Sequence, residues 1–324
     1  MSDALVHTVV VMGTVVSIQI VGHGGSQRAR RARASAMQRA IGWFYRVETV
    51  CSRFDASSEV RQLSTHVGTP VVVSPMLFEA VQFAVAVDDD TDGAFDPTVG
   101  ARMEQRGFDR DYRTNARVGA QADVATDVSF RDLTLDATGR TITLRRPLRL
   151  DLGAVAKGLA VDMAARELAP LTNFAIDAGG DLYLGGHNAD DALWRVGIRH
   201  PRDRSLLIDT LTVSDCAVCT SGDYERVVAL TTQPAVEHAS DAHERGDHHL
   251  MDARTGGAVS HTASVTVMAP SAMVADALGT AAFVLGPADG IALLQRHGVQ
   301  GMIVTPSLER FATERVAAEQ VATA

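Results

Sequence analysis

The chain has 324 residues, 46% of them hydrophobic and 21% charged, and its formal net charge is -9. This composition predicts a folded chain that buries a sizeable core, and it excludes intrinsic disorder. The negative charge argues against a nucleic-acid partner. No apolar run is long enough for a transmembrane helix. The first 22 residues show no basic leader or cleavage site, so we expect a cytoplasmic protein, unless an export signal was trimmed away.

The N-terminal third begins with β-branched residues, which predict a strand over residues 8–21. Apolar residues at helical spacing predict a helix over residues 28–51. Ser74 and Pro75 are typical of a helix start, and the helix that follows ends in the acidic run 88–92. That run is either a calcium-like cluster or an exposed turn, and the turn is favoured.

Further along, residues 124–150 alternate like paired strands around the turn at Ala137, Thr138 and Gly139. Other strands are predicted near residues 173–184, 193–200, 206–219, 225–232 and 263–269, and helices near residues 154–168 and 272–285. There is no strict alternation of strand and helix, and no linker or repeat. We therefore expect an α+β fold in which residues 1–324 form a single large domain of mixed sheets with flanking helices.

Cysteines and histidines offer two metal or redox alternatives. Three cysteines cannot form a disulfide framework, which fits a reducing compartment. Cys216 and Cys219 have the spacing of a redox pair or half a zinc site, but buried cysteines in a strand are the favoured interpretation. Four histidines lie in a polar, loop-like stretch, which is interpreted as an insertion. Their spacing fits a pair of metal ligands on one helix only for the first two, and only loosely. These histidines are His238, His243, His248 and His249.

A metal-ligating pair is suggested by Asp276 and Thr280, which are four residues apart in the apolar segment AMVADALGTAAFVLG. A helix would place both on one side, and a buried carboxylate needs a positive partner. Oxygen ligands of this kind suit Mg²⁺. The alternative is structural, with Thr280 bonded to its own backbone and Asp276 paired with an arginine.

Four glycine-bearing segments add to this pair. They are GAFDPTVG at 93–100, DLGAVAKG at 151–158, DAGGD at 177–181 and TSGDY at 220–224. Each can be ordinary turn chemistry. Glycine also lets the backbone approach a ligand, and the second segment leads into a helix whose N-terminus, with Lys157 nearby, is suited to phosphate.

The order of these motifs along the chain resembles that of ApbE-type flavin transferases, the FAD:protein FMN transferases. The motifs that carry the resemblance are GAFDPTVG, DLGAVAKG, DAGGDLYLGG, TSGDYER, the stretch from His249 to Gly256, SVTVMA and ADALGTA. The resemblance runs from Met12 to about Val304, nearly the whole chain. It implies an enzyme that binds FAD and Mg²⁺, moves FMN to a Thr or Ser hydroxyl of an acceptor protein and releases AMP. The expected acceptor carries a motif of the type Asp-x-x-Ser/Thr-Gly-Ala-Thr, which this chain lacks, so we expect it to be another protein.

The resemblance also implies roles for individual residues. Asp276, Thr280 and the carbonyls of Ala154 and Gly279 would hold the metal, with Asp276 essential for catalysis. His249 would be the general base toward the acceptor hydroxyl. The positions that match FAD contacts are Met12, Phe54, Ala94, Phe95, Asp96, Asp151, Lys157 and Leu250.

Three departures from the family pattern affect the predicted site. Ala253 replaces a usual proline, Gly279 a usual alanine and Phe54 a common tyrosine. The stretch 233–248 is also longer and more acidic than expected. Two alternatives therefore stay open, a Mg²⁺-dependent FAD pyrophosphatase that produces FMN and AMP, and a flavin-binding protein without catalysis.

Overall fold

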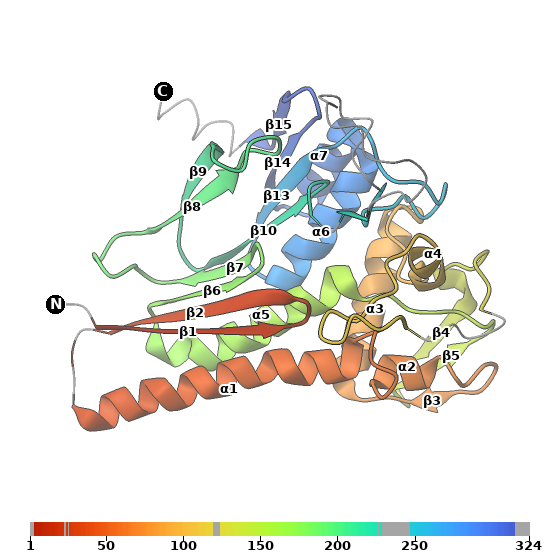
Figure 1. Cartoon of the computed structure of the whole chain (residues 1–324), viewed down its shortest axis with the longest axis horizontal. Coiled ribbons are helices and arrows are strands. Elements are labelled where there is room, and N and C mark those ends of the chain that lie inside the picture. Colours follow the sequence, from red (N-terminus) through yellow and green to blue (C-terminus); the bar gives the residue numbers. More distant parts are fainter. Residues whose placement is uncertain are drawn as a thin grey trace.

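An eight-stranded antiparallel sheet forms the centre of the fold in this computed structural model (Figure 1). The structure describes residues 3–22, 24, 26–118, 124–225, 227–228 and 247–314. The strand order of the sheet is β1-β2-β6-β7-β10-β13-β14-β15. In chain order these strands are β1 (Asp3–Val11), β2 (Thr14–Gly22), β6 (Phe174–Ala178), β7 (Asp181–Gly185), β10 (Cys216–Gly222), β13 (Ser264–Ala269), β14 (Gln300–Val304) and β15 (Arg310–Ala312).

Three smaller sheets accompany it. One has the order β3-β5-β4, and the other two pair β8 with β9 and β11 with β12. These strands are β3 (Val71–Val72), β4 (Leu133–Asp136), β5 (Thr141–Leu144), β8 (Trp194–Arg199), β9 (Leu207–Val213), β11 (Val227–Val228) and β12 (Asp247–His248).

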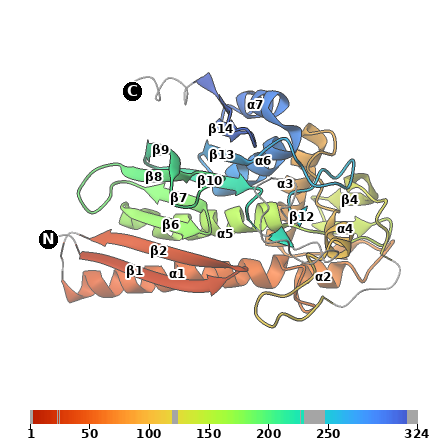
Figure 2. The same cartoon turned by 45° about the horizontal axis from the view of Figure 1, so that its top comes forward.

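The helices supply most of the remaining core. They are α1 (Gln27–Cys51), α2 (Glu59–Leu63), α3 (Pro75–Asp90), α4 (Gly100–Gln105), α5 (Gly153–Leu168), α6 (Ala272–Leu285) and α7 (Pro287–Arg296), with 3₁₀ turns at Phe130–Asp132 and Ala169–Leu171. Helix α5 packs against both α1 and α6. Figure 2 shows α1 running along the β1–β2 hairpin. Figure 1 shows α2, α3, α4 and the small β3-β5-β4 sheet gathered at the end of the molecule away from the N-terminus. The expected α+β class with several sheets and flanking helices is confirmed, and the strands that pair within each described sheet are antiparallel.

The N-terminal prediction of one strand over residues 8–21 is wrong. The segment is a hairpin in which Val11 pairs with Thr14, so Met12 and Gly13 form a two-residue turn. Both turn residues have positive φ angles, 55° and 72°, as the favoured hairpin turn requires. The turn therefore lies where the ends of β1 and β2 meet.

Other predicted elements agree with the structure to within a few residues, with several exceptions. The segment 206–219 is two strands, β9 and β10, separated at Ser214 and Asp215, and the segment 173–184 is likewise two strands, β6 and β7, separated at Gly179 and Gly180. Residues 124–132 are not a strand. The predicted strand at 225–232 lies largely outside the described residues. Helices α2, α4 and α7 were not predicted. Among the described residues, no helix is long and apolar enough to cross a membrane.

The contact between α5 and α6 depends on Gly158. A Cβ added there would lie 2.5 Å from the carbonyl oxygen of Ala272 and from the backbone of Met273. We expect Gly158→Ala to destabilise the fold by about 1–3 kcal/mol, because two backbones must separate. The matched control is Gly42→Ala in α1, where an added Cβ meets nothing within 4 Å and should stabilise by about 0.5–1 kcal/mol. Urea unfolding of both variants checks this, and equal stabilisation by both would contradict it.

Candidate functional site

One cavity of about 610 Å³ collects most of the residues predicted as functional. Its walls come from the hairpin turn, the segment after α1, the loop before α4, the start of α5, the middle and C-terminal part of α6, and the segment after β12. The predicted residues that line it are Met12, Phe54, Ala94, Phe95, Asp96, Asp151, Ala154, Lys157, His249, Leu250, Asp276 and Thr280. Gly279 is buried in α6 and is not among the lining residues.

Two buried carboxylates lie beside Lys157, a residue of the cavity wall. The Nζ of Lys157 contacts the Oδ2 of Asp181 and lies 3.6 Å from the Oδ2 of Asp276. Asp181 is 1% exposed and Asp276 is 4% exposed. The ammonium group offsets much of the cost of burying these charges. The pairing of Lys157 with Asp181 was not predicted, although both residues lie in motifs that the sequence singled out.

Asp276 and other lining residues offer oxygen ligands for a metal. Asp276 and Thr280 are one turn apart on α6, and both line the cavity, as does Ala154 in the first turn of α5. A buried carboxylate with a hydroxyl and backbone carbonyls is the donor set that a hard divalent cation prefers. These residues therefore fit Mg²⁺, and the carbonyl of Gly279 as a further ligand stays a prediction.

Aromatic rings and thioethers also line the cavity. Besides Phe54, Phe95 and Met12, it contains Met103, Phe108 and Tyr112, which sequence reasoning did not find. Apolar and aromatic walls of this kind suit a planar ring.

Glu48 of α1, which the sequence did not single out, bonds to the hairpin turn and to the loop after α4. Its Oε1 accepts hydrogen bonds from the backbone N–H of Met12 at 3.0 Å and from the hydroxyl of Tyr112 at 2.8 Å. Its other oxygen, Oε2, pairs with Arg113 at 2.5 Å. The hairpin turn and the loop after α4 are therefore held against the same helix.

Two further predicted residues have well-defined polar contacts. Asp96 Oδ1 accepts hydrogen bonds at 2.7 Å from both the backbone N–H and the hydroxyl of Thr98. Burial raises the pKa of Asp96 despite those bonds. The Nδ1 of His249 lies 3.2 Å from the carbonyl of Glu225. Because a carbonyl can only accept, this bond requires the proton on Nδ1 and leaves the basic lone pair on Nε2.

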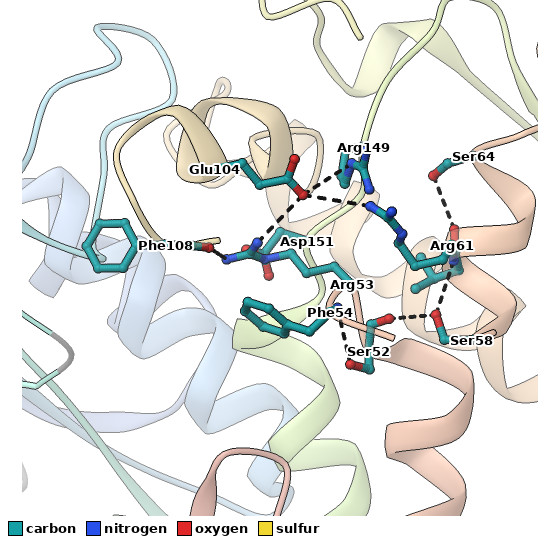
Figure 3. A network of polar contacts seen from close by, with 11 residues as sticks. Ser52, Arg53, Phe54, Ser58, Arg61, Ser64, Glu104, Phe108, Arg149 and Asp151 are labelled. Carbon is teal, nitrogen blue, oxygen red and sulfur yellow. Dashed lines mark hydrogen bonds and ion pairs between the residues drawn. The ribbon is translucent and has the colours of Figure 1, made fainter. Parts of the chain in front are cut away.

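Arg53 contacts three other residues of the cavity wall, Asp151, Phe108 and Phe54 (Figure 3). Its Nε donates a hydrogen bond to the Oδ2 of Asp151 at 2.7 Å, and its Nη2 donates one to the carbonyl of Phe108 at 2.6 Å. Its guanidinium carbon lies 4.1 Å from the ring centre of Phe54. These contacts join residues far apart in the sequence, so no local motif reveals them.

The cysteine and histidine alternatives gain no support from the geometry. Cys219 is in the main core and Cys216 packs in a separate small cluster, so they form no thiol pair. Burial raises the pKa of Cys219 well above its ordinary value, which keeps the thiol protonated. His248 is buried, with its Nε2 2.8 Å from the carbonyl of Val259. His238 and His243 lie outside the described residues.

The acidic run at the end of α3 differs from the exposed turn that was expected. Asp88 is fully buried, and Asp90 pairs with His297 at 2.7 Å. In the ranges that the structure describes, no group of three or more His, Cys, Asp or Glu side chains is arranged to hold a metal ion. The run therefore includes one buried carboxyl as well as exposed ones.

A cavity lined by aromatic rings, a lysine and carboxylates suits a ligand that carries both a planar ring and a phosphate, as in proteins that bind nucleotide-like ligands. The chain belongs to the ApbE family, whose sequence model matches residues 12–303. The resemblance deduced from the motifs is thereby confirmed.

Individual relatives agree with this assignment. The FAD:protein FMN transferase of Treponema pallidum (strain Nichols) is 30% identical, over 91% of this chain and 83% of that protein. The enzyme of the same name from Vibrio cholerae is 27% identical, over 93% and 87% of the two chains. Among solved structures, the ApbE protein from Thermotoga maritima superposes with a TM-score of 0.81 and 27% identity, covering 98% of this chain and 99% of that one.

Proposed function

We propose that this protein is an FAD:protein FMN transferase that uses Mg²⁺, modifies a Thr or Ser hydroxyl of an acceptor protein and releases AMP. The observation that carries the proposal is the single cavity in which Lys157, Asp276, Thr280 and His249 line the walls together with aromatic side chains. Family membership and the names of the relatives support the same activity.

The proposed reaction is a displacement at phosphorus. The acceptor hydroxyl oxygen bonds to the phosphorus of the FMN half of FAD, the bond to the bridging oxygen breaks, and AMP leaves with that electron pair. His249 receives the hydroxyl proton on Nε2, since its Nδ1 donates to the carbonyl of Glu225. The ammonium of Lys157 binds a phosphate oxygen and balances its charge.

The metal would be held beside Lys157. The Asp276 carboxylate, the Thr280 hydroxyl and the carbonyls of Ala154 and Gly279 would coordinate it, and a bound Mg²⁺ supplies further charge neutralisation on the pyrophosphate. Lys157 has two carboxylate neighbours, so this group of residues can neutralise a cation as well as bind an anion.

A direct test mixes the protein with FAD, Mg²⁺ and an acceptor protein that carries an Asp-x-x-Ser/Thr-Gly-Ala-Thr type motif. We expect covalent flavin, seen by in-gel fluorescence, and one AMP released for each flavin attached. The matched control is the same acceptor with its Ser or Thr replaced by alanine, which should stay dark. An unmodified acceptor despite measured FAD binding would contradict transferase activity. AMP release without any acceptor would instead identify water as the acceptor.

A further inference from the structure

Arg53 belongs to a buried cluster of three arginines around Glu104 (Figure 3). The Oε1 of Glu104 lies 3.9 Å from Arg53, 3.8 Å from Arg61 and 3.3 Å from Arg149. The side chain of Arg53 is 5% exposed and that of Arg149 is 1% exposed. With Asp151, the cluster contains three positive and two negative side chains. Burying such a group of charges is costly, and the cost is offset only by ion pairs and hydrogen bonds of good geometry.

Arg53 is the member of the cluster that reaches the substrate cavity. It lines the cavity, as do its partners Phe54, Phe108 and Asp151, whereas Arg61 and Arg149 do not. Its planar guanidinium donates in two directions, to Asp151 Oδ2 and to the Phe108 carbonyl, and also lies over the Phe54 ring. A lysine could not reproduce this fork, because its ammonium is a single point of charge.

The contact with Asp151 fixes that side chain on both oxygens. Oδ2 accepts from Arg53, and Oδ1 accepts from the backbone N–H of Gly153 at 2.8 Å, at the start of α5. A carboxylate oxygen can accept more than one hydrogen bond, so the side chain of Asp151 is chemically suited to accept a hydrogen bond from a ligand in the cavity. Arg53 thus sets the orientation of a ring and of a carboxylate on the same wall.

We propose that Arg53 is a positioning residue for one of the two heteroaromatic rings of FAD, and this rests on the proposed function. Arg53 holds Phe54 for contact with the face of that ring and Asp151 for a hydrogen bond to its polar edge. Because the contacts of Arg53 are with Phe54, Phe108 and Asp151 rather than with Lys157 or Asp276, we expect Arg53 to act on FAD affinity far more than on the phosphoryl step.

The test compares Arg53→Met with Arg61→Met as a matched control. Each variant removes one guanidinium near Glu104 and leaves two positive and two negative side chains, so both change the cluster charge equally. Among the described residues, no ion pair or side-chain hydrogen bond joins Arg61 to a residue that lines the cavity. We measure the FAD dissociation constant by quenching of flavin fluorescence, KM and kcat for FAD, and the melting temperature.

For Arg53→Met we expect at least a tenfold rise in the dissociation constant and KM, with kcat changed less than threefold. Arg53→Lys should lie between this variant and the wild type, and Arg61→Met should bind FAD within twofold of the wild type. Unchanged FAD affinity in folded Arg53→Met, or an equal loss in Arg61→Met, would overturn the proposal. If Arg53→Met does not fold, Arg53→Lys against Arg61→Lys decides by the same comparison. FAD affinity is measured without an acceptor, so failure here is distinct from failure of the transferase assay.

Discussion

Asp276→Ala is expected to lower turnover of FAD by at least about a thousandfold, or about 4 kcal/mol of transition-state stabilisation, while the protein stays folded. The change removes the only carboxylate in the proposed ligand set for Mg²⁺. The fold should tolerate it, because Asp181 still pairs with Lys157 when Asp276 is absent. A buried charge therefore does not lose its last partner.

Turnover is measured over a magnesium titration, together with the melting temperature in FAD, with and without Mg²⁺. A ligand that binds only the folded state raises stability with its concentration, so the wild type should be stabilised by Mg²⁺ and Asp276→Ala should not. Asp289→Ala, an exposed acid on the neighbouring helix α7, is the control and should behave like the wild type in both measurements. Wild-type turnover by Asp276→Ala at every magnesium concentration would exclude the metal assignment.

The long helices could be predicted because their apolar spacing and caps are local. The predicted helices at residues 28–51, 154–168 and 272–285 differ from α1, α5 and α6 by one residue at most. The hairpin turn at Met12 was missed because methionine is an unusual residue at positive φ, and the β-branched residues on both sides continue the strand pattern. Helix α7 was missed although Gly286 and Pro287 are typical start residues.

The candidate site could be assembled from the sequence only through the order of its motifs. That order gave the residues proposed for phosphate and metal, and Lys157, Asp276 and Thr280 do line one cavity. Residues such as Glu48 and Arg53 act through contacts across 36 and 98 positions of the chain, to Met12 and Asp151. Neither residue belongs to a motif, and a charged residue in a helical or turn segment predicts a solvated side chain. Only the tertiary packing shows that they are buried.

Asp88 provides the second large expected effect, on stability rather than activity. Its carboxyl is 0% exposed, and neither oxygen has a hydrogen-bond partner in the described part of the chain. Burial, and next the charge of Asp96, raise the pKa of Asp88 from 3.8 to about 9. The folded state therefore holds a proton that the unfolded state releases above pH 3.8. This contribution to stability is complete at low pH and declines by about 1.4 kcal/mol per pH unit until the pH reaches the pKa of the folded state.

Asp88→Asn removes this titration while keeping a side chain of similar shape. We expect the unfolding free energy of the variant, relative to that of the wild type, to be about 4 kcal/mol higher at pH 8 than at pH 5. Urea unfolding at the two pH values measures the difference, and Asp89→Asn, an exposed neighbour on α3, controls for the loss of charge at the helix end. If the gap between Asp88→Asn and the wild type is the same at both pH values, Asp88 is ionised in the folded protein. The end of α3 beneath the Gly93–Gly100 loop would then be more polar than the burial of Asp88 indicates.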